Sequence, residues 1–260
     1  MSLVALKDSI SSGPRGLTRD LLQHGELEAP RAEPLRLGPS VDAALPDGGL
    51  PRGSVVELAS PLGLARATSL AARACVAAQG RRHAGSIEWC AWIDPWCTLH
   101  APGLHQRGVD LERLLVVRPA EDAIARSAVR VAASRAFALV VIDLAPPLGL
   151  EGVQVALSRW PNVVRRLALA IESSSTTVLL LTDGSAHRAL PLPVAMRIEL
   201  ERDRDRGTRL RIAKDRHGRL TGFTSFDLDA PSLGVCRANV ASDPIASRRG
   251  GPAGSVLPVR

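Results

Sequence analysis

Residues 54–69 read Ser-Val-Val-Glu-Leu-Ala-Ser-Pro-Leu-Gly-Leu-Ala-Arg-Ala-Thr-Ser. The first six residues form a short apolar and β-branched run, which is typical of a buried strand. Beyond the stretch, Ala71, Ala74, Cys75 and Ala78 recur at the spacing of a helix. The segment therefore predicts a strand, a loop and a helix, in that order.

The loop in this segment stands where a phosphate-binding loop would stand, but it lacks the residues that bind phosphate. Such loops follow the pattern G-x-x-x-x-G-K-[ST]: glycines let backbone N–H groups wrap the phosphates, the Lys reaches the outer phosphates, and the hydroxyl holds magnesium. The key positions here are Ser60, Ala65, Arg66 and Ala67. Because Ala67 offers no oxygen to a metal, the sequence predicts a vestigial nucleotide pocket, which also includes Pro61.

The composition indicates a globular protein with an excess of positive charge. Of the 260 residues, 45% are hydrophobic, and the formal net charge of +7 comes almost wholly from arginine, since Lys7 and Lys214 are the only lysines. This excess fits nucleic acid or an acidic protein partner, and it fits equally the arginine-rich bias of a GC-rich genome.

Metal, disulfide and membrane roles find no support in the sequence. The four cysteines lack the spacing of a metal site, and the histidines share no common spacing, so we expect buried free thiols and no metal. The N-terminus has no apolar core of a signal peptide, and no later run approaches transmembrane length. We therefore expect a cytoplasmic protein that does not bind membranes.

The chain divides into three parts. Residues 1–45 are expected to form an N-terminal segment, with a short helix around Leu17–Leu27 and an extended linker over the proline-rich Pro30–Pro46. Residues 46–228 are expected to form the core domain. Residues 229–260, which contain Gly250-Gly-Pro-Ala-Gly254, are expected to be disordered.

Within the core, strand and helix patterns alternate, which predicts an α/β domain with a mostly parallel sheet flanked by helices. The strongest strand pattern ends at Asp143, and an acid at that end of a strand faces the ligand crevice of an open α/β sheet. Apolar and charged residues alternate at 196–200 and 209–213, which predicts an antiparallel hairpin on one edge. Further strands are expected at 54–59, 89–94, 114–117, 137–143 and 177–182.

Two helices are expected between the later strands. One carries Ile124, Ala128 and Val131 on one stripe, and the next spans about residues 152–173 with a wide apolar face that includes Ala168. Basic residues off that face and on the hairpin are candidate contacts with DNA or an acidic partner, although a solvated surface explains them as well. These residues are Arg159, Arg165, Arg166, Arg209, Arg211, Lys214 and Arg216.

Five stretches occur in an order that is characteristic of one family: Gly49-Leu-Pro-Arg-Gly-Ser-Val-Val-Glu-Leu58, Ala91-Trp-Ile-Asp94, Gly108-Val-Asp-Leu-Glu-Arg-Leu-Leu115, Val116-Val-Arg-Pro119 and Leu139-Val-Val-Ile-Asp143. Over about residues 46–228 the chain resembles the RecA recombinase family, and especially its divergent ImuA and SulA-like relatives. The resemblance implies a RecA-like fold.

The resemblance also implies that most of the family's nucleotide chemistry is missing. The catalytic Glu of the family corresponds to Trp96, which cannot act as a base and is expected to fill the vacated space. The acid on the magnesium side is retained as Asp143, whereas Asp183 replaces the amide that senses the γ-phosphate. The segment that reaches a neighbouring subunit corresponds to Lys214–Arg216, so self-association stays open.

In functional terms, the resemblance implies a non-catalytic accessory protein of the DNA-damage response and of error-prone translesion synthesis, without catalytic residues or cofactor. The implied partners are a Y-family polymerase-like protein and an error-prone polymerase subunit, with RecA itself and DNA as further candidates. Two alternatives stay open. One is a weak RecA-type ATPase or recombinase paralogue, and the other is a SulA-like inhibitor of the tubulin-like division protein.

Overall fold

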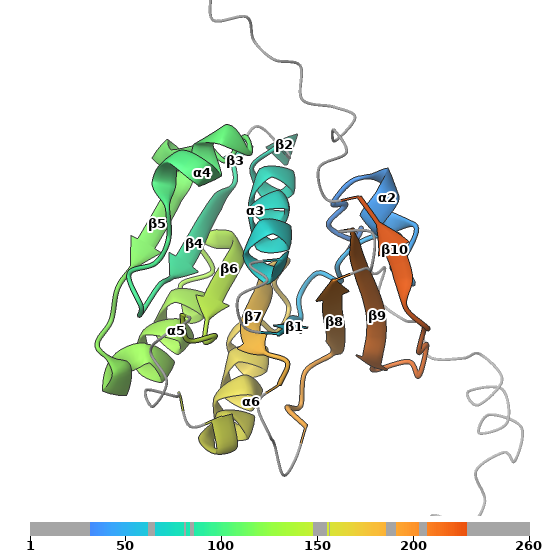
Figure 1. The fold of residues 1–260 in the computed structure, drawn as a ribbon. Coiled ribbons are helices and arrows are strands. Elements are labelled where there is room, and N and C mark those ends of the chain that lie inside the picture. Colours follow the sequence, from blue (N-terminus) through green and yellow to red (C-terminus); the bar gives the residue numbers. More distant parts are fainter. Residues whose placement is uncertain are drawn as a thin grey trace, which may run out of the picture.

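The fold is built around one eight-stranded sheet (Figure 1). The structure is a computed structural model, and it describes residues 32–61, 66–80, 82–83, 86–147, 155, 157–185, 191–202 and 207–227. The strand order is β10-β9-β8-β1-β7-β6-β4-β5. The strands are β1 Val55–Ser60, β4 Trp89–Ile93, β5 Leu114–Val117, β6 Phe137–Asp143, β7 Thr177–Asp183, β8 Met196–Arg202, β9 Thr208–Asp215 and β10 Thr224–Phe226.

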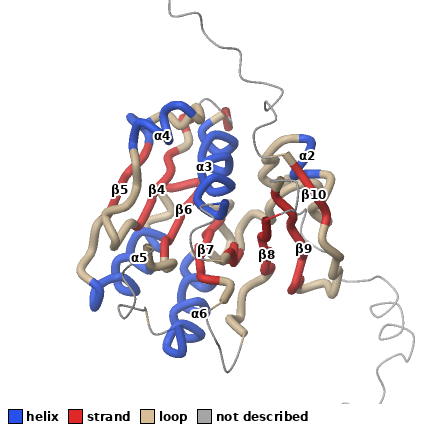
Figure 2. The backbone as a smooth tube through the Cα atoms, in the orientation of Figure 1, coloured by secondary structure: helices blue, strands red, loops and turns tan. Residues whose placement is uncertain are grey.

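Helices and short turns connect these strands (Figure 2). The α-helices in the described residues are α2 Pro39–Asp42, α3 Arg66–Gln79, α4 Ala101–Gln106, α5 Ile124–Ala133 and α6 Trp160–Ala170. Single 3₁₀ turns are η1 Leu111–Arg113, η2 Glu121–Ala123 and η3 Leu157–Arg159, and a separate small ribbon pairs β2 Arg82–His83 with β3 Ser86–Ile87. None of these helices is both long and apolar enough to cross a membrane.

The sheet confirms the predicted architecture. Six neighbouring strands, from β5 through β4, β6, β7 and β1 to β8, pair in parallel. The strands β8 and β9 form the predicted antiparallel hairpin. One further strand, β10, was not predicted from the sequence; it pairs antiparallel with β9 and forms the edge of the sheet. Its three residues include a single buried one, Phe226, so they carry too short a pattern to detect.

Two apolar clusters cover the two faces of the sheet. One joins α3 to the even-numbered residues of β1 and β8, whereas the other joins α5 and α6 to the opposite face. Every residue of β1 and of β7 is buried, because both strands lie in the centre with helices on each side. In β8, by contrast, buried and half-buried residues alternate.

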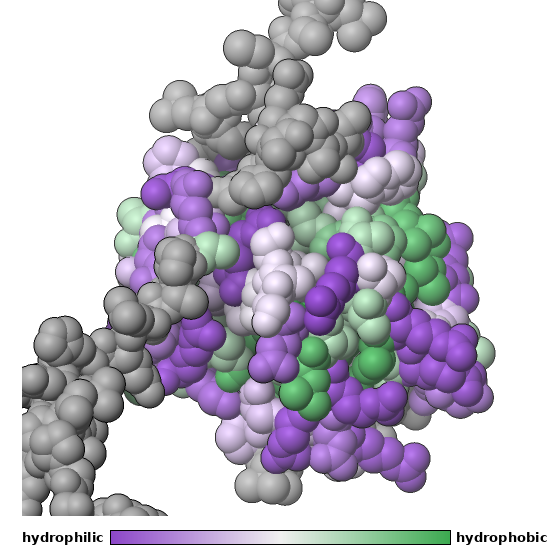
Figure 3. All heavy atoms as spheres, turned by 180° about the vertical axis from the view of Figure 1, so that it is seen from behind, coloured by the Kyte–Doolittle hydropathy of each residue, from purple (hydrophilic) through white to green (hydrophobic). Residues whose placement is uncertain are grey.

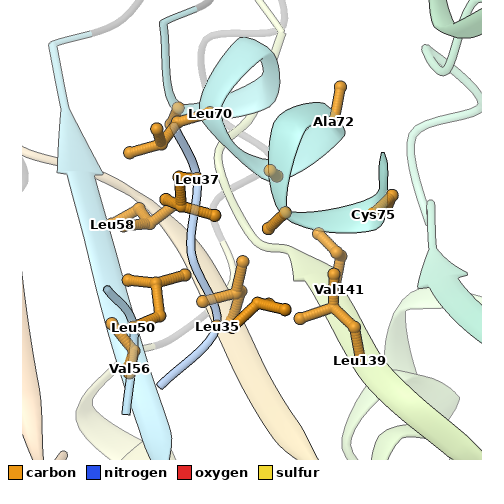
Figure 4. Packing of buried hydrophobic residues seen from close by; sticks show 14 of the residues in the cluster. Leu35, Leu37, Leu50, Val56, Leu58, Leu70, Ala72, Cys75, Leu139 and Val141 are labelled. Atoms are coloured by element: carbon orange, nitrogen blue, oxygen red, sulfur yellow. The ribbon is translucent and has the colours of Figure 1, made fainter. Parts of the chain in front are cut away.

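The prediction of an extended linker is wrong for residues 35–45. The buried side chains of Leu35, Leu37, Val41 and Leu45 belong to the same cluster as α3 and the edge strands. Leu35 also exchanges both backbone hydrogen bonds with Leu50, at 2.8 and 2.9 Å. Figure 4 shows Leu35, Leu37 and Leu50 packed beside Leu58 and Leu70. These apolar residues are ordered because they complete the core, despite the prolines around them.

Three further expectations need adjustment. The helix predicted from about residue 152 begins at Trp160, after η3, and residues 148–154 lie outside the described part. Ala168, expected on its apolar face, is exposed. In α5 the third buried residue is Ala132, whereas Val131 is half-buried, because the stripe repeats every four residues. The helix at Leu17–Leu27 and the tail at 229–260 also lie outside the described residues.

Candidate functional site

A cavity of about 450 Å³ opens at the carboxyl ends of β1 and β6. This is where parallel α/β sheets place their ligands. Its walls come from the end of β1, the first turns of α3, the loop into α4 and the residues after β6. The lining residues are Ser60, Pro61, Ala67, Thr68, Ser69, Ala72, Thr98, Leu99, His100, Gly103, Leu104, Arg107, Asp143, Ala145, Pro146, Pro147 and Leu181.

The structure brings together four of the six residues that the sequence assigned to the vestigial nucleotide pocket. Ser60, Pro61, Ala67 and Asp143 all line the cavity. Ala65 lies outside the described residues, as do Leu62, Gly63 and Leu64, and the side chain of Arg66 is likewise not described. Four of the predicted residues thus share one cavity, and their role in binding nucleotide stays a prediction.

The first turn of α3 presents small side chains to the cavity. Ala67 is buried, with 5% of its surface exposed, and its methyl group carries no atom that could bind a metal. The next two residues, Thr68 and Ser69, are half-buried and bring hydroxyl groups to the same wall. The hydroxyls thus lie one and two residues beyond the position that the P-loop pattern requires.

Asp143 is the buried acid of the cavity. Only 8% of its surface is exposed, and its Oδ1 accepts the backbone N–H of Ala145 at 3.2 Å. Burial raises the pKa of Asp143 from 3.8 to about 7, the Ala145 N–H opposes the rise, and the charge of Asp94 adds to it. Near neutral pH a large fraction of Asp143 is therefore protonated and uncharged.

Asp94, at the end of β4, holds the loop that leads into α4. Its carboxylate is fully buried and accepts the backbone N–H groups of Thr98 at 3.0 Å and Leu99 at 3.2 Å. Nε of Arg118 donates at 3.3 Å to Oδ2, the oxygen that also accepts from Leu99. By these contacts Asp94 holds one wall of the cavity in place. Its negative charge also helps to raise the pKa of Asp143.

Trp96 does not occupy the position expected of it. It is half-buried and is not among the residues that line the cavity, so its predicted role as a hydrophobic plug is not supported. The wall that the sequence analysis missed is the loop and helix α4, with His100, Leu104 and Arg107. This wall has little signal in the sequence, since α4 is a six-residue helix that begins at a proline-containing turn.

Asp183, at the end of β7, is engaged in its own turn. Its Oδ1 accepts both the backbone N–H and the hydroxyl of Ser185, at 2.9 and 2.6 Å. The preceding Thr182 donates its hydroxyl to the buried Glu57 at 2.7 Å. Neither acid lines the cavity, so Asp183 and Glu57 stabilise the sheet and its turn.

The basic residues predicted on the hairpin are engaged with neighbours. Arg209 pairs with Glu201 at 3.2 Å, and Arg211 pairs with Glu199 across the same two strands. Both guanidinium groups also lie over the ring of Phe223, at 5.1 and 4.8 Å from its centre. Lys214 donates to the carbonyl of Leu192, and Arg216 donates to His217. The hairpin therefore fits a solvated, internally paired surface.

The second group of predicted contact residues consists of arginines in and just before α6. Arg159, Arg165 and Arg166 are exposed, as expected, and lie off the buried face of α6 formed by Trp160, Val164, Leu167 and Ile171.

In the residues described, no cluster of three or more His, Cys, Asp or Glu side chains could hold a metal ion.

Comparison with known proteins points to RecA. No protein-family model matches the chain. Curated relatives are the protein RecA of Cutibacterium acnes, 31% identical over 176 residues, and that of Gluconacetobacter polyoxogenes, 30% identical over 193 residues. These matches cover 62% and 68% of this chain, and 48% and 53% of the relatives. The chain thus spans about half the length of the curated relatives it matches. Together with the sheet order, the matches support a RecA-like α/β fold.

Proposed function

We propose that this RecA-like chain is a non-catalytic accessory protein of the DNA-damage response that acts in error-prone translesion synthesis through contacts with other proteins. The observation that carries the proposal is the pairing, in one cavity, of Ala67 with a buried Asp143 whose pKa is raised to about 7. By the resemblance, these two residues correspond to those with which a RecA-type ATPase would hold magnesium.

The residues of the cavity do not fit magnesium and a nucleoside triphosphate. A metal that bridges the phosphates needs a hydroxyl at the position of Ala67 and an ionised carboxylate opposite it. Ala67 supplies only a methyl group, and the hydroxyls of Thr68 and Ser69 lie one and two residues beyond that position. We therefore derive no hydrolytic step for this chain and assign its fold to binding.

A weak ATPase is the second candidate, and specific features favour it. The cavity volume of about 450 Å³ is in the range of small-molecule sites. Thr68 and Ser69 bring hydroxyls to the start of α3, a fourteen-residue helix whose N-terminus attracts anions. A SulA-like inhibitor of cell division is a third candidate, which rests on the resemblance alone.

A genetic complementation experiment tests the proposal. A strain that lacks the gene is complemented with the wild-type chain or with Asp143→Ala, and mutants are counted after ultraviolet irradiation, with protein levels checked by immunoblot. We expect the deletion to lower the frequency of induced mutants and both chains to restore it equally. An unchanged frequency in the deletion strain would refute the role in mutagenesis, whereas failure of Asp143→Ala at normal protein levels would favour the ATPase.

Overexpression separates the third candidate from the first. A SulA-like inhibitor would cause cells to grow as filaments even in a strain without translesion polymerases. The accessory role predicts normal division in that strain. The partners implied by the resemblance, a Y-family polymerase-like protein and an error-prone polymerase subunit, would be tested by purification of the tagged chain from irradiated cells.

A further inference from the structure

Exposed arginines gather on the outer surface of the layer formed by α5 and α6. Two of them, Arg126 and Arg130, lie in α5, and two more, Arg165 and Arg166, lie in α6. Arg135 follows α5, and Arg159 precedes α6. We call these six residues the α5–α6 arginine face. Figure 3, which views the molecule from behind, shows hydrophilic side chains over much of this side.

The helical geometry directs these side chains away from the sheet. In α5 the buried residues are Ile124, Ala128 and Ala132, so Arg126 and Arg130 fall on the opposite side of the helix. In α6 the buried residues are Trp160, Val164 and Leu167. Arg165 and Arg166 therefore lie on the solvent side of the helix. Both helices thus present arginine to solvent along their length.

The two helices pack against each other as one layer. Because α5 leads into β6 and α6 leads into β7, and these two strands are parallel neighbours, the helices run in roughly the same direction. Just beyond their ends, Nη2 of Arg135 donates to the carbonyl of Glu172 at 3.2 Å. The four helical arginines therefore lie on adjacent helices of one layer.

These arginines differ from the others in their lack of acidic partners. Within the part of the chain that the structure describes, none of the six forms an ion pair with a carboxylate, although Arg165 donates to the side-chain oxygen of Asn162 at 2.9 Å. By contrast, Arg209 and Arg211 on the hairpin are each paired with a glutamate on the adjacent strand. The arginines of the helical layer can therefore pair with carboxylates of another molecule, whereas Arg209 and Arg211 of the hairpin already pair with glutamates of this chain.

An exposed leucine lies near the C-terminal end of α6. Leu169 has 66% of its surface exposed and follows Arg165 and Arg166 by one turn of α6. A phosphate backbone offers nothing to pack against an isolated leucine, whereas an amphipathic peptide does. The α5–α6 arginine face is also short, because α5 has ten residues and is about 15 Å long. Two exposed acids, Glu121 and Glu172, flank this face. A long nucleic acid would meet those acids, whereas a short peptide would not.

We propose that the α5–α6 arginine face is the docking surface for an acidic, amphipathic segment of a partner protein. Carboxylates of the segment would pair with Arg126, Arg130, Arg165 and Arg166, since guanidinium groups bind carboxylates in a bidentate manner. An apolar side chain would cover Leu169. The proposal rests on the proposed function only in so far as that function requires a protein partner.

A direct binding assay tests this surface. The probe is a fluorescein-labelled helical peptide of about 12 residues, about the length of α5, with glutamates along one face and leucines along the other. Fluorescence anisotropy measures its binding to the full chain, to Arg130→Glu/Arg166→Glu and to Leu169→Asn. The control Arg36→Glu/Arg216→Glu changes the net charge equally at exposed sites outside this face. A single-stranded oligonucleotide serves as the competing class of ligand.

We expect the arginine double variant to weaken peptide binding by about tenfold or more, and Leu169→Asn to weaken it by about threefold with no effect on the oligonucleotide. The control should stay within about twofold of the wild type. Absence of peptide binding by the wild type, or an equal loss in the control variant, would overturn the proposal. So would an oligonucleotide that binds the same arginines more tightly than the peptide. Because the assay involves no DNA damage, its failure is distinct from failure of the mutagenesis experiment.

Discussion

Replacement of Asp143 by asparagine should stabilise the protein, and the gain should grow with pH. Asp143 is 8% exposed, and burial raises its pKa in the folded state from 3.8 to about 7. In the unfolded chain the carboxyl ionises near its ordinary pKa. Between these two values the folded state therefore binds more protons than the unfolded state, so stability falls as pH rises through that window.

The expected size follows from the shift. A difference of about three pKa units corresponds to about 4 kcal/mol of unfolding free energy between pH 4 and pH 8. The loss accumulates at about 1.4 kcal/mol per pH unit between the two pKa values and levels off above pH 7. The amide side chain of the Asp143→Asn variant does not ionise, so the variant should gain this amount relative to the wild type at pH 8 and little at pH 4.

Urea unfolding of both proteins at a series of pH values measures the difference. Taking the difference removes the contribution of every other ionisable group that the two proteins share. As a control, Asp110→Asn should behave oppositely, because the hydrogen bond from Arg113 lowers the pKa of Asp110. That variant should be less stable at neutral pH, with a deficit that shrinks as the solution is acidified. A constant difference for Asp143→Asn between pH 4 and pH 8 would refute the placement of an uncompensated acid in this cavity.

Two substitutions test the fold around the site. Leu35→Ala should lower the unfolding free energy by about 3 kcal/mol, because Leu35 is fully buried in the main apolar cluster, and Leu220→Ala, at a side chain with 65% exposure, should change it by less than about 0.5 kcal/mol. Urea titration of both variants checks this, and equal effects would mean that residues 35–45 are a linker after all. Gly53→Ala should lower the melting temperature, because Gly53 has a φ of +62° and an added Cβ would lie 2.7 Å from the carbonyl oxygen of Ser174. The matched Gly222→Ala, with no atom within 4 Å, should leave the melting temperature unchanged in the same calorimetric scan.

The core strands could be predicted from the sequence because their signal is local. The uninterrupted apolar run from Phe137 to Ile142 is sufficient to indicate a strand buried on both faces, as the structure confirms. The position of Asp143 at its carboxyl end follows from the same pattern. Local patterns thus placed both the sheet and the crevice.

Features that depend on distant residues could not be predicted in this way. Leu35 and Leu37 lie among prolines, and only their packing beside β1 and α3 makes them part of the core. The raised pKa of Asp143 depends on burial and on Asp94, which lies 49 positions earlier in the chain. Likewise, the pairing of Arg209 with Glu201 follows from the register of β8 and β9, which the composition of the hairpin does not specify.

We propose that this RecA-like fold does not hydrolyse nucleotide, and the release of phosphate from ATP tests this proposal. The intact chain is incubated with ATP and magnesium, with and without single-stranded DNA, beside the Asp143→Ala variant. We predict that the wild-type chain releases phosphate at the same background rate as the variant under both conditions. Phosphate release above background that is stimulated by DNA and lost in Asp143→Ala would show that the chain is an ATPase and that the proposal is wrong.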